Sequence, residues 1–362
     1  MANRRALMFG AGGWPAVWVR RFLPAFAHRL DVVGLVDANP EALSISGDRL
    51  GLAEHQRFAE MDAAFAATDA DFCILALPPA PRAQAVAQAT ARGLPILCEK
   101  PIADSWENAV AIARMAREAD VKLSVVQNYR YTRKIMTLKQ ALTEGSLGRI
   151  SSIHCRFAAD YTPETAGGAF RHRIPDAMIY EGAEHHLDQF RNLAGADCAW
   201  ISGAQWNPPG SQFEHTACAM FQMQMTNGVM GQYHMTHVAR GLQNGWHEES
   251  YRVECEHGDV IVDRDGVVRI VEHLGEGYQR ATECQPVGDE PDGHFLVIEE
   301  FLDWLDGGPA PQTALDDNLR TAALTFGAVE ATHTNQVVDV MAKLADAGIG
   351  VEKADRGAMR CR

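Results

Sequence analysis

The sequence contains no closely spaced cysteines. Its eight cysteines lie far apart in the chain, and no two have the Cys-x-x-Cys spacing of a zinc ribbon. A disulfide framework is not indicated either, because such frameworks belong to small secreted chains that are dense in cysteine. Reduced thiols, and therefore a cytoplasmic location, fit this pattern best.

Long apolar runs and clusters of basic residues are also absent. The apolar runs, such as residues 72–77, are far shorter than the roughly 20 residues of a membrane-spanning helix. The first apolar stretch of the chain is too short for the core of a secretory signal. A formal net charge of −14, from 47 acidic and 33 basic side chains, disfavours binding to a phosphate backbone. We therefore expect neither a membrane nor a nucleic acid as a partner.

The chain does contain enough apolar residues for packed cores. Hydrophobic residues make up 47% of its 362 positions, and this length favours two domains. In the first third of the chain, short apolar runs alternate with stretches whose apolar residues recur every three or four positions. The expected strands are residues 6–9, 32–36, 72–77, 95–98 and 123–126, and the expected helices are residues 15–30, 40–51, 81–93 and 105–119. This alternation predicts a doubly wound parallel sheet.

The pattern changes after about residue 127. Alternating segments now dominate and are separated by turn signals such as Asn227-Gly228, which is typical of a mostly antiparallel sheet. The expected strands include residues 217–226, 229–237, 251–256 and 267–271, and the expected helices are residues 134–144, 181–193, 295–306 and 315–332. We therefore predict an α/β protein whose first domain spans residues 1–126 and whose second, α+β domain spans residues 127–362.

A glycine turn, Gly10-Ala11-Gly12-Gly13, stands between the first expected strand and the first expected helix. In this context backbone amides at a helix start can hold a pyrophosphate, which indicates a Rossmann dinucleotide-binding domain. The third position of the glycine fingerprint is Pro15. Proline is tolerated in a first helical turn, but the close packing that a third glycine would allow must then be achieved differently.

The second expected strand ends at Asp37. A dinucleotide-binding fold places at this point the carboxylate that accepts hydrogen bonds from the ribose hydroxyls. A carboxylate there repels a 2′-phosphate, so NAD is favoured over NADP. The alternative is that Asp37 only caps the turn at residues 37–40.

A second motif, Cys98-Glu99-Lys100-Pro101, stands at the carboxyl end of an expected strand, the edge where α/β sheets bind their ligands. A lysine in this place can hydrogen-bond a substrate hydroxyl and, if desolvated, help to move its proton. The alternative is that Glu99 and Lys100 form an ordinary solvated surface pair. The position at the strand end favours the first interpretation, and Pro101 would rigidify the turn.

A third motif places Glu181, His185 and Asp188 at positions i, i+4 and i+7 of an expected helix, so that an imidazole lies between two carboxylates on one face. A neighbouring carboxylate raises the basicity of the ring, as proton transfer near neutral pH requires. Two alternatives stay open, a zinc site and an exposed polar helix start capped by acids. No third and fourth ligand has the spacing of a metal site, so we expect no metal.

Together these three motifs resemble the glucose–fructose oxidoreductase, inositol dehydrogenase and rhizopine-catabolism (Gfo/Idh/MocA) family. The resemblance spans nearly the whole chain and extends to three further segments, residues 77–79, 127–131 and 144–150. It implies a Rossmann domain followed by a domain with a large, mostly antiparallel open sheet. In the family the exposed face of that sheet commonly packs against another subunit, which implies a homodimer or homotetramer.

The resemblance also implies roles for single residues. Lys100 matches the lysine that contacts both the nicotinamide and the reacting hydroxyl, and His185 matches the acid/base histidine. Glu181 stands where the family usually has aspartate, so its carboxylate is moved outward by one methylene. Two more departures are Ala183, in the place of a glycine, and Arg82, in the place of a histidine that often follows the proline loop.

From these motifs and the resemblance we expect three groups of functional residues. The expected catalytic residues are Lys100, His185 and Glu181. The expected cofactor-binding residues are Gly10, Gly12, Gly13, Trp14, Asp37, Leu77, Pro78, Pro79, Glu99, Lys100 and Asn128. The expected substrate-binding residues are Lys100, Asn128, Tyr161, Arg171, His172, Glu181, His185 and Trp246, with His247 as a further candidate.

The predicted reaction is a reversible hydride transfer between nicotinamide and a carbinol carbon of a sugar, an inositol or a related polyol. His185 would remove or return the hydroxyl proton while Lys100 stabilises the alkoxide, and the two could exchange these roles. The cationic cluster at residues 171–173 leaves an anionic sugar acid open as the substrate. Two other functions stay open: a glycoside hydrolase or lyase that retains NAD and uses transient oxidation, and a non-catalytic NAD- or ligand-binding regulator.

Overall fold

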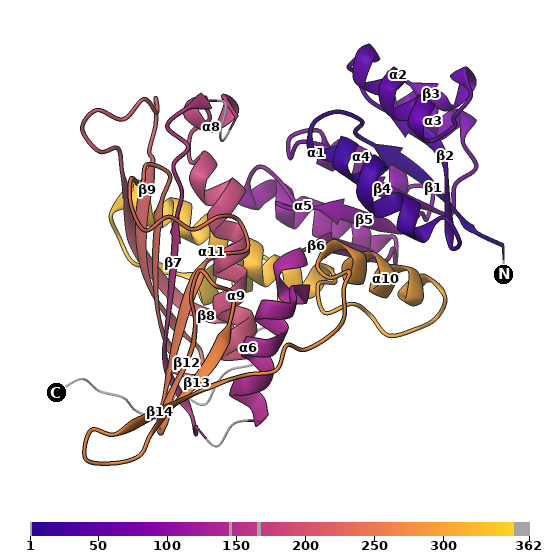
Figure 1. Ribbon diagram of the computed structural model, residues 1–362. Coiled ribbons are helices and arrows are strands. Elements are labelled where there is room, and N and C mark those ends of the chain that lie inside the picture. Colours follow the sequence, from indigo (N-terminus) through magenta and orange to yellow (C-terminus); the bar gives the residue numbers. More distant parts are fainter. Residues whose placement is uncertain (1, 145–146, 165–167, 351–362) are drawn as a thin grey trace. The chain divides into compact units, whose positions relative to one another are not determined.

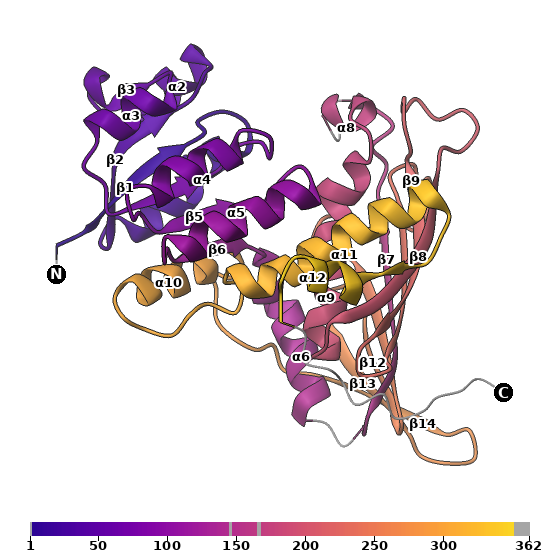
Figure 2. The same ribbon diagram turned by 180° about the vertical axis from the view of Figure 1, so that it is seen from behind.

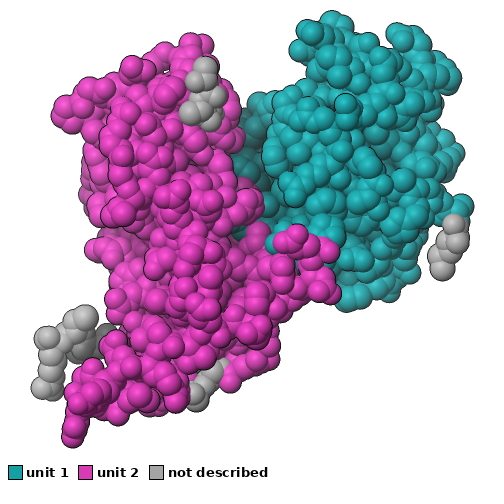
Figure 3. Space-filling view, in the orientation of Figure 1, with its two compact units in different colours: residues 1–131, 291–322 teal, residues 132–290, 323–362 magenta. Residues whose placement is uncertain are grey.

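The computed structural model describes residues 2–144, 147–164 and 168–350. Two positions of the family-like segment 144–150, Gly145 and Ser146, lie outside the described residues. The chain forms two compact units, which Figure 3 shows in different colours. The first unit comprises residues 1–131 and 291–322, and the second comprises residues 132–290 and 323–362.

The first unit is built on a six-stranded sheet in which every neighbouring pair of strands is parallel. The strands are β1 (Arg4–Phe9), β2 (Leu30–Val36), β3 (Arg57–Phe58), β4 (Phe72–Leu75), β5 (Ile96–Glu99) and β6 (Leu123–Val126). Their order, β3-β2-β1-β4-β5-β6, is that of a Rossmann sheet. The expected doubly wound parallel sheet is confirmed.

Helices flank this sheet (Figures 1 and 2). They are α1 (Trp14–Val17), η1 (Trp18–Phe22), η2 (Leu23–Phe26), α2 (Pro40–Arg49), η3 (Glu54–Gln56), α3 (Met61–Ala67), α4 (Arg82–Thr90), α5 (Trp106–Glu118) and η4 (Asn128–Tyr131). Strands β4, β5 and β6 are buried at every position, as apolar strands between two helical layers must be. Side chains cap two of the helices, Asn39 at the start of α2 and Ser105 at the start of α5.

The first expected helix, residues 15–30, is divided into shorter pieces. Segments α1, η1 and η2 follow one another from Trp14 to Phe26, and η1 is a π-helical turn while η2 is a 3-10 helix. Pro24 has no backbone N–H, so the α-helical bond to the carbonyl of Arg20 cannot form there. The regular helix is therefore lost before Pro24, and strand β2 begins soon after.

Residues 291–322 pack in the first unit, although they follow most of the second unit in the sequence. Helix α10 (His294–Leu305) buries Val297 and Phe301 in the same core as Trp18 and Phe72, and the rings of Phe72 and Phe301 lie 5.7 Å apart. Segment η4 also belongs to the first unit. Helix α11 (Leu315–Thr334) begins in the first unit and ends in the second. The observed division thus differs from the boundary expected after residue 126, because the apolar face of α10 is buried in the Rossmann core.

The second unit is built on a nine-stranded sheet with the order β14-β13-β12-β11-β7-β10-β9-β8-β15. The strands are β7 (Ile150–Ala158), β8 (Cys198–Trp206), β9 (Cys218–Met225), β10 (Met230–Thr236), β11 (Ser250–Cys255), β12 (Gly258–Val262), β13 (Val268–His273), β14 (Gln279–Glu283) and β15 (Val338–Asp339). Strands β7 and β10 are parallel, and the other neighbouring pairs are antiparallel. The expected large, mostly antiparallel sheet is confirmed.

One face of this sheet is covered by helices (Figure 1). The helices of the second unit are α6 (Arg133–Glu144), α8 (Phe170–Arg173), η5 (Ile179–Ala183), α9 (Glu184–Ala194), the end of α11 and α12 (Val340–Asp346). Strand β10 alternates accordingly: Tyr233 and Met235 are buried under the helices, whereas Met230 and Gln232 are exposed on the other face. Within the described part of the chain, no helix has the length and apolar character needed to cross a membrane.

Candidate active site

The glycine turn connects β1 to α1. Gly10 has a φ of 103°, and a Cβ atom placed on it would lie 2.6 Å from the carbonyl oxygen of Ala76 and 2.9 Å from Cγ of Pro15. Gly10 therefore allows the start of the helix to pack closely on the ends of β1 and β4. The close packing expected of a third glycine is achieved here by the Pro15 ring against Gly10.

Asp37 follows β2, where the sequence placed it. Its Oδ2 accepts hydrogen bonds from the amides of Ala11 (2.6 Å) and Gly12 (3.2 Å), so the carboxylate is tied to the glycine turn. Its Oδ1 accepts a hydrogen bond from the amide of Asn39 at 2.8 Å. Asp37 thus caps the turn at residues 37–40 and also lies against the glycine turn.

The proline loop, residues 77–79, is joined to the end of β5 by Arg82. The Arg82 guanidinium is only 2% exposed and donates hydrogen bonds to the carbonyls of Leu77, Glu99 and Lys100. An arginine at this position therefore links two of the segments expected to bind the cofactor. The histidine that often stands here in the family could not reach three carbonyls, since it has only two ring nitrogens.

Glu99 lies at the last position of β5 and is buried in a cluster of aromatic donors. Its Oε1 accepts hydrogen bonds from the indole nitrogens of Trp14 (2.7 Å) and Trp18 (2.8 Å), and Nε2 of His294 lies 3.5 Å away. Burial alone would raise the pKa of Glu99, but the donors from His294 and the two indoles lower it to about 2. Glu99 is therefore a buried carboxylate that stays ionised, and not half of a solvated surface pair.

Lys100 follows directly, at the carboxyl edge of the Rossmann sheet. Its amide donates to Oε2 of Glu99 at 3.2 Å, and its carbonyl accepts a hydrogen bond from Arg82 at 3.3 Å. The Lys100–Pro101 peptide bond is cis. Asn128, in η4, is buried in the same unit, with Nδ2 about 3.9 Å from the position of a Cβ atom on Gly293.

The third motif lies in the second unit, on η5 and α9. The helix begins at Ile179 with a π-helical turn, a feature frequent at functional sites, and every residue of α9 is buried. His185 is 8% exposed and Asp188 is fully buried, so this is not an exposed polar helix start. Glu181 and Arg171 form an ion pair at 3.5 Å.

Aromatic residues gather around this helix start. The ring of Trp246 is stacked near that of Tyr161 (6.3 Å, 23°), and a Cβ atom on Gly182 would lie 3.0 Å from the Trp246 ring. The Arg171 guanidinium lies 5.8 Å from the centre of the Tyr161 ring. Four of the expected substrate-binding residues, namely Tyr161, Arg171, Glu181 and Trp246, are thus brought together within the second unit.

Two other residues expected to bind substrate, His172 and His247, make hydrogen bonds within the second unit. His172 is buried, stacks on Phe213 at 4.0 Å, and holds Nε2 at 2.9 Å from the carbonyl oxygen of Tyr161. His247 has its amide bonded to Oε1 of Glu249 (2.9 Å), and its carbonyl accepts from Nζ of Lys134 (2.6 Å). These contacts support the loops that carry Tyr161 and Trp246.

The sequence did not predict a buried polar cluster around His186, the residue that follows His185. His186 is fully buried, with Nδ1 2.5 Å from the Tyr233 hydroxyl and Nε2 3.2 Å from Oε1 of Glu249. Nζ of Lys134 lies 3.4 Å from Oε2 of the same carboxylate. Burial alone would raise the pKa of Glu249, but His186 and Lys134 lower it to about 2. Only the double histidine at 185–186 hinted at this cluster.

A second missed residue is His237, which follows β10. Its ring lies 5.0 Å from that of Tyr161 and 6.1 Å from that of Phe157. It is 1% exposed, and neither ring nitrogen has a hydrogen-bond partner among the described residues. Burial, reinforced by the positive charge of Arg171, lowers the pKa of His237 to about 3. The ring is therefore neutral at physiological pH.

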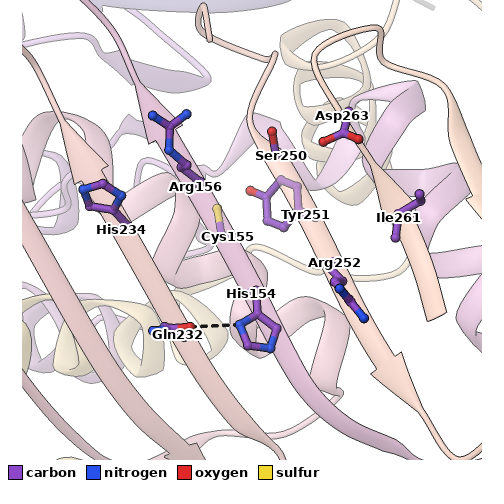
Figure 4. Close-up of a pocket in the computed structure, with 10 residues that line it drawn as sticks. All are labelled: His154, Cys155, Arg156, Gln232, His234, Ser250, Tyr251, Arg252, Ile261 and Asp263. Carbon is purple, nitrogen blue, oxygen red and sulfur yellow. Dashed lines mark hydrogen bonds between the residues drawn. The ribbon is translucent and has the colours of Figure 1, made fainter. Parts of the chain in front are cut away.

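A depression of about 440 Å³ lies on the sheet, and Figure 4 shows the residues that line it. It is lined by residues of β7, β10, β11 and β12 and of the adjoining loop, namely His154, Cys155, Arg156, Gln232, His234, Ser250, Tyr251, Arg252, Ile261 and Asp263. Nδ1 of His154 lies 3.0 Å from Oε1 of Gln232. Gln232 and His234 alternate along β10 with Tyr233, which contacts His186, so the depression opens mainly on the face away from α9. Across the described ranges, no group of three or more potential ligands from His, Cys, Asp and Glu is placed to hold a metal ion.

Comparison with known proteins identifies the two units. Residues 4–127 match the oxidoreductase family with an NAD-binding Rossmann fold, and residues 135–261 match the GFO/IDH/MocA C-terminal domain. The chain belongs to the Gfo/Idh/MocA oxidoreductase family. This membership confirms the family resemblance, the NAD cofactor and the oxidoreductase class.

Relatives and solved structures agree with this membership. The uncharacterized protein y4oX of Sinorhizobium fredii is 35% identical over 357 residues, which cover 96% of this chain and 98% of that protein. The D-apiose dehydrogenase of Rhizobium rhizogenes is 24% identical over 86% of this chain and 91% of that enzyme. An oxidoreductase from Agrobacterium radiobacter, solved in complex with NAD+, L-tartaric acid and magnesium, has a TM-score of 0.81 at 20% identity over 94% of this chain and 99% of that one. This last likeness shows the shared fold.

The residues of the first unit fit a bound NAD. The Gly10 position has no room for a side chain, and a Cβ atom on Gly12 would lie 3.1 Å from Cβ of Ala42. Gly10 and Gly12 therefore allow the turn to pack closely on neighbouring segments. A Cβ atom on Gly13 would have no atom within 4 Å, so the backbone there leaves room for the close approach of a pyrophosphate. The Asp37 carboxylate is half-buried directly after β2, where a dinucleotide-binding fold has the carboxylate that binds the ribose hydroxyls.

Proposed function

We propose that the protein is an NAD-dependent dehydrogenase that transfers a hydride between nicotinamide and a carbinol carbon of a sugar or related polyol. The observation that carries this proposal is the placement of Lys100 at the carboxyl edge of an NAD-binding sheet, with its backbone held by two buried charged side chains, Arg82 and Glu99. Bound NAD+ would accept the hydride. The alcohol becomes a carbonyl, and the hydroxyl proton passes to the protein and then to solvent.

Lys100 is assigned to the hydroxyl oxygen. Its backbone is bonded to Glu99 through the amide and to Arg82 through the carbonyl, which limits how far the start of the side chain can move. An ammonium group held in place stabilises the negative charge that develops on the alcohol oxygen.

His185 is assigned to the proton. Its helix, α9, is buried along its whole length, and His186 fixes the same turn by its contacts with Tyr233 and Glu249. A histidine with a supported backbone can accept the hydroxyl proton during oxidation and return it during reduction. Lys100 belongs to the first unit and His185 to the second.

The second unit supports a polyol as the substrate. Tyr161 and Trp246 present aromatic rings, which pack against the C–H groups of a sugar ring, while the pair Arg171 and Glu181 offers donors and acceptors for hydroxyl groups. Because Glu181 balances the charge of Arg171, a neutral sugar is favoured over a sugar acid. The relative named D-apiose dehydrogenase is consistent with this class.

We also propose a homodimer or homotetramer assembled through the open face of the large sheet. Exposed apolar side chains on strands β8, β9 and β10, namely Trp206, Met220 and Met230, are 37–45% exposed in the isolated chain. Contact with another subunit would bury them. A cytoplasmic location stays a prediction, supported by the free thiols of the described cysteines.

A panel of sugars, inositols and sugar acids with NAD and with NADP tests the proposal, with reduced nicotinamide as the readout. We expect activity with NAD and at least one neutral sugar or polyol. Activity with sugar acids alone would overturn the substrate class. Absence of activity across the panel would favour a regulator or an NAD-retaining hydrolase. Release of a stoichiometric amount of nicotinamide cofactor on denaturation of the purified protein would identify the NAD-retaining hydrolase.

A further inference from the structure

A single carboxylate oxygen in the first unit accepts hydrogen bonds from two tryptophans. Oε1 of Glu99 lies 2.7 Å from Nε1 of Trp14 and 2.8 Å from Nε1 of Trp18, and Oε2 accepts the amide of Lys100 at 3.2 Å. The two tryptophans are 85 and 81 residues away in the sequence. One side chain therefore connects the start of the nucleotide-binding helix to the backbone of Lys100.

The two indoles differ in their surroundings. Trp18 is fully buried in the core of the unit, whereas Trp14 is 49% exposed and directly follows Gly13, the last glycine of the turn. A pyrophosphate held by this turn would lie beside Trp14 and not beside Trp18. The Trp14 bond is thus the one that can respond to the nucleotide, and the Trp18 bond holds the carboxylate in the core.

The carboxylate is also fixed from other directions. The imidazole of His294 lies 3.5 Å from Oε1 of Glu99 and stacks on Phe22 at 4.4 Å and 7°. Arg82 holds the carbonyl oxygens of Glu99 and Lys100. These contacts restrict rotation of the Glu99 side chain, whose other carboxylate oxygen holds the amide of Lys100.

We propose that Glu99 is a positioning residue that couples occupation of the glycine turn to the placement of Lys100, with Trp14 as the link. The inference rests on the proposed role of Lys100 in catalysis. Such coupling is reciprocal: a nucleotide that orders Lys100 is itself bound more tightly by the ordered form. An enzyme built in this way presents its lysine correctly only after the cofactor is bound.

The test follows the acetylation of Lys100 by acetic anhydride, measured by peptide mass spectrometry on the full chain. ADP is the probe because it carries the pyrophosphate but no nicotinamide group to cover Lys100. ADP saturation is established by calorimetry for each variant, and Lys122 serves as the internal reference lysine. We expect saturating ADP to change the rate at Lys100 at least threefold in the wild-type protein.

Two matched variants locate the link. Trp14→Phe and Trp18→Phe each remove one indole N–H from the same oxygen and keep an aromatic ring. We expect the ADP effect to fall below 1.5-fold in Trp14→Phe and to persist in Trp18→Phe. A full effect in Trp14→Phe, or no effect in the wild-type protein, would overturn the proposal. Because Trp14 is half-exposed, its replacement is compatible with folding.

A second readout separates positioning from binding. In Trp14→Phe and Glu99→Gln we expect kcat to fall at least fivefold while the KM for the polyol stays within twofold. A change in KM alone would contradict the inference. The acetylation assay needs no turnover, so an inactive substrate panel would count against the proposed function without deciding this inference.

Discussion

The phenolic oxygen of Tyr233 lies 2.5 Å from Nδ1 of His186, and both side chains are fully buried. The other ring nitrogen of His186 faces Glu249 at 3.2 Å. The imidazole therefore joins a strand of the large sheet to the loop before β11, and it does so one residue after the proposed acid/base His185. The placement of His185 depends on this buried cluster.

Replacing His186 by Phe should destabilise the second unit strongly. The buried Glu249 carboxylate would lose the imidazole nitrogen at 3.2 Å, and leaving a buried polar group without its partner costs about 1–3 kcal/mol, or more for a charged group. Tyr233→Phe should cost about 1–2 kcal/mol, because it removes one hydrogen bond and leaves the Glu249 pair in place. Urea unfolding monitored by circular dichroism measures both values. Tyr278→Phe, at a position 70% exposed, is the control and should be neutral; equal effects at positions 186 and 278 would contradict the account.

His237 should make stability depend on pH between about 6.5 and 5. Burial first, and then the nearby Arg171, lowers its pKa from 6.5 to about 3 in the folded protein. In this range the unfolded chain binds a proton that the folded protein does not, so the free energy of unfolding falls as the pH falls, by up to about 1.4 kcal/mol per pH unit.

Urea unfolding of the wild-type protein and of His237→Phe at pH 6.5 and 5 measures this contribution. The free energy of unfolding should depend less steeply on pH in His237→Phe than in the wild-type protein. The control His273→Gln, at an exposed position, should have the same pH dependence as the wild-type protein. The buried carboxylates Glu99 and Glu249, whose pKa values are lowered from 4.5 to about 2, lose their stabilising effect only at lower pH. Identical slopes in wild type and His237→Phe would contradict the assignment.

The pair formed by Arg171 and Glu181 should set the charge preference for substrate. Glu181→Gln removes the carboxylate at 3.5 Å from the guanidinium, so Arg171 can attract an anionic substrate instead. We expect the ratio of kcat/KM for a sugar acid to that for a neutral sugar to rise about tenfold, equivalent to about 1.4 kcal/mol. Arg173→Gln is the matched control, since Arg173 is a neighbouring arginine that pairs with Glu164 and Glu214. An unchanged ratio in Glu181→Gln would show that the pair does not determine the charge preference for substrate.

Asp37 should determine the choice between NAD and NADP. Replacement by Ser removes a negative charge that would repel a 2′-phosphate, and it also removes the acceptor for the amides of Ala11 and Gly12. We expect NAD affinity to fall at least about tenfold, a loss of about 1.4 kcal/mol, while NADP affinity falls less or rises. Calorimetric titration with both cofactors tests this. A parallel loss for NAD and NADP would mean that Asp37 acts only by holding the turn.

Much of the fold was readable from the sequence because regular apolar patterns encode it. The five strand segments expected in the first domain correspond to β1, β2, β4, β5 and β6, and the second sheet is mostly antiparallel as its turn signals indicated. The sequence could not show that α10 packs in the Rossmann core, because the partner surface lies far away in the chain. The two-residue strand β3 was missed because it is too short to produce a pattern.

The candidate site was readable where residues form local motifs. Gly10, Asp37, Lys100 and His185 stand at strand ends or on a helix, as the motifs indicated. Contacts between distant segments gave no local signal: the bond from Trp14 to Glu99 and the return of His294 to the same carboxylate depend on tertiary packing. Glu99 was therefore expected at the carboxyl end of β5, where it lies, but its partners were not foreseen.

The most direct test of the proposed dehydrogenase is the initial rate of nicotinamide reduction at saturating NAD with the best polyol of the panel. Wild type, Lys100→Ala and His185→Ala are compared, and NAD binding to each is measured by calorimetry. The account predicts that each variant loses turnover by at least about a thousandfold, about 4 kcal/mol, and still binds NAD within about fivefold. Turnover by Lys100→Ala at the wild-type rate would contradict it.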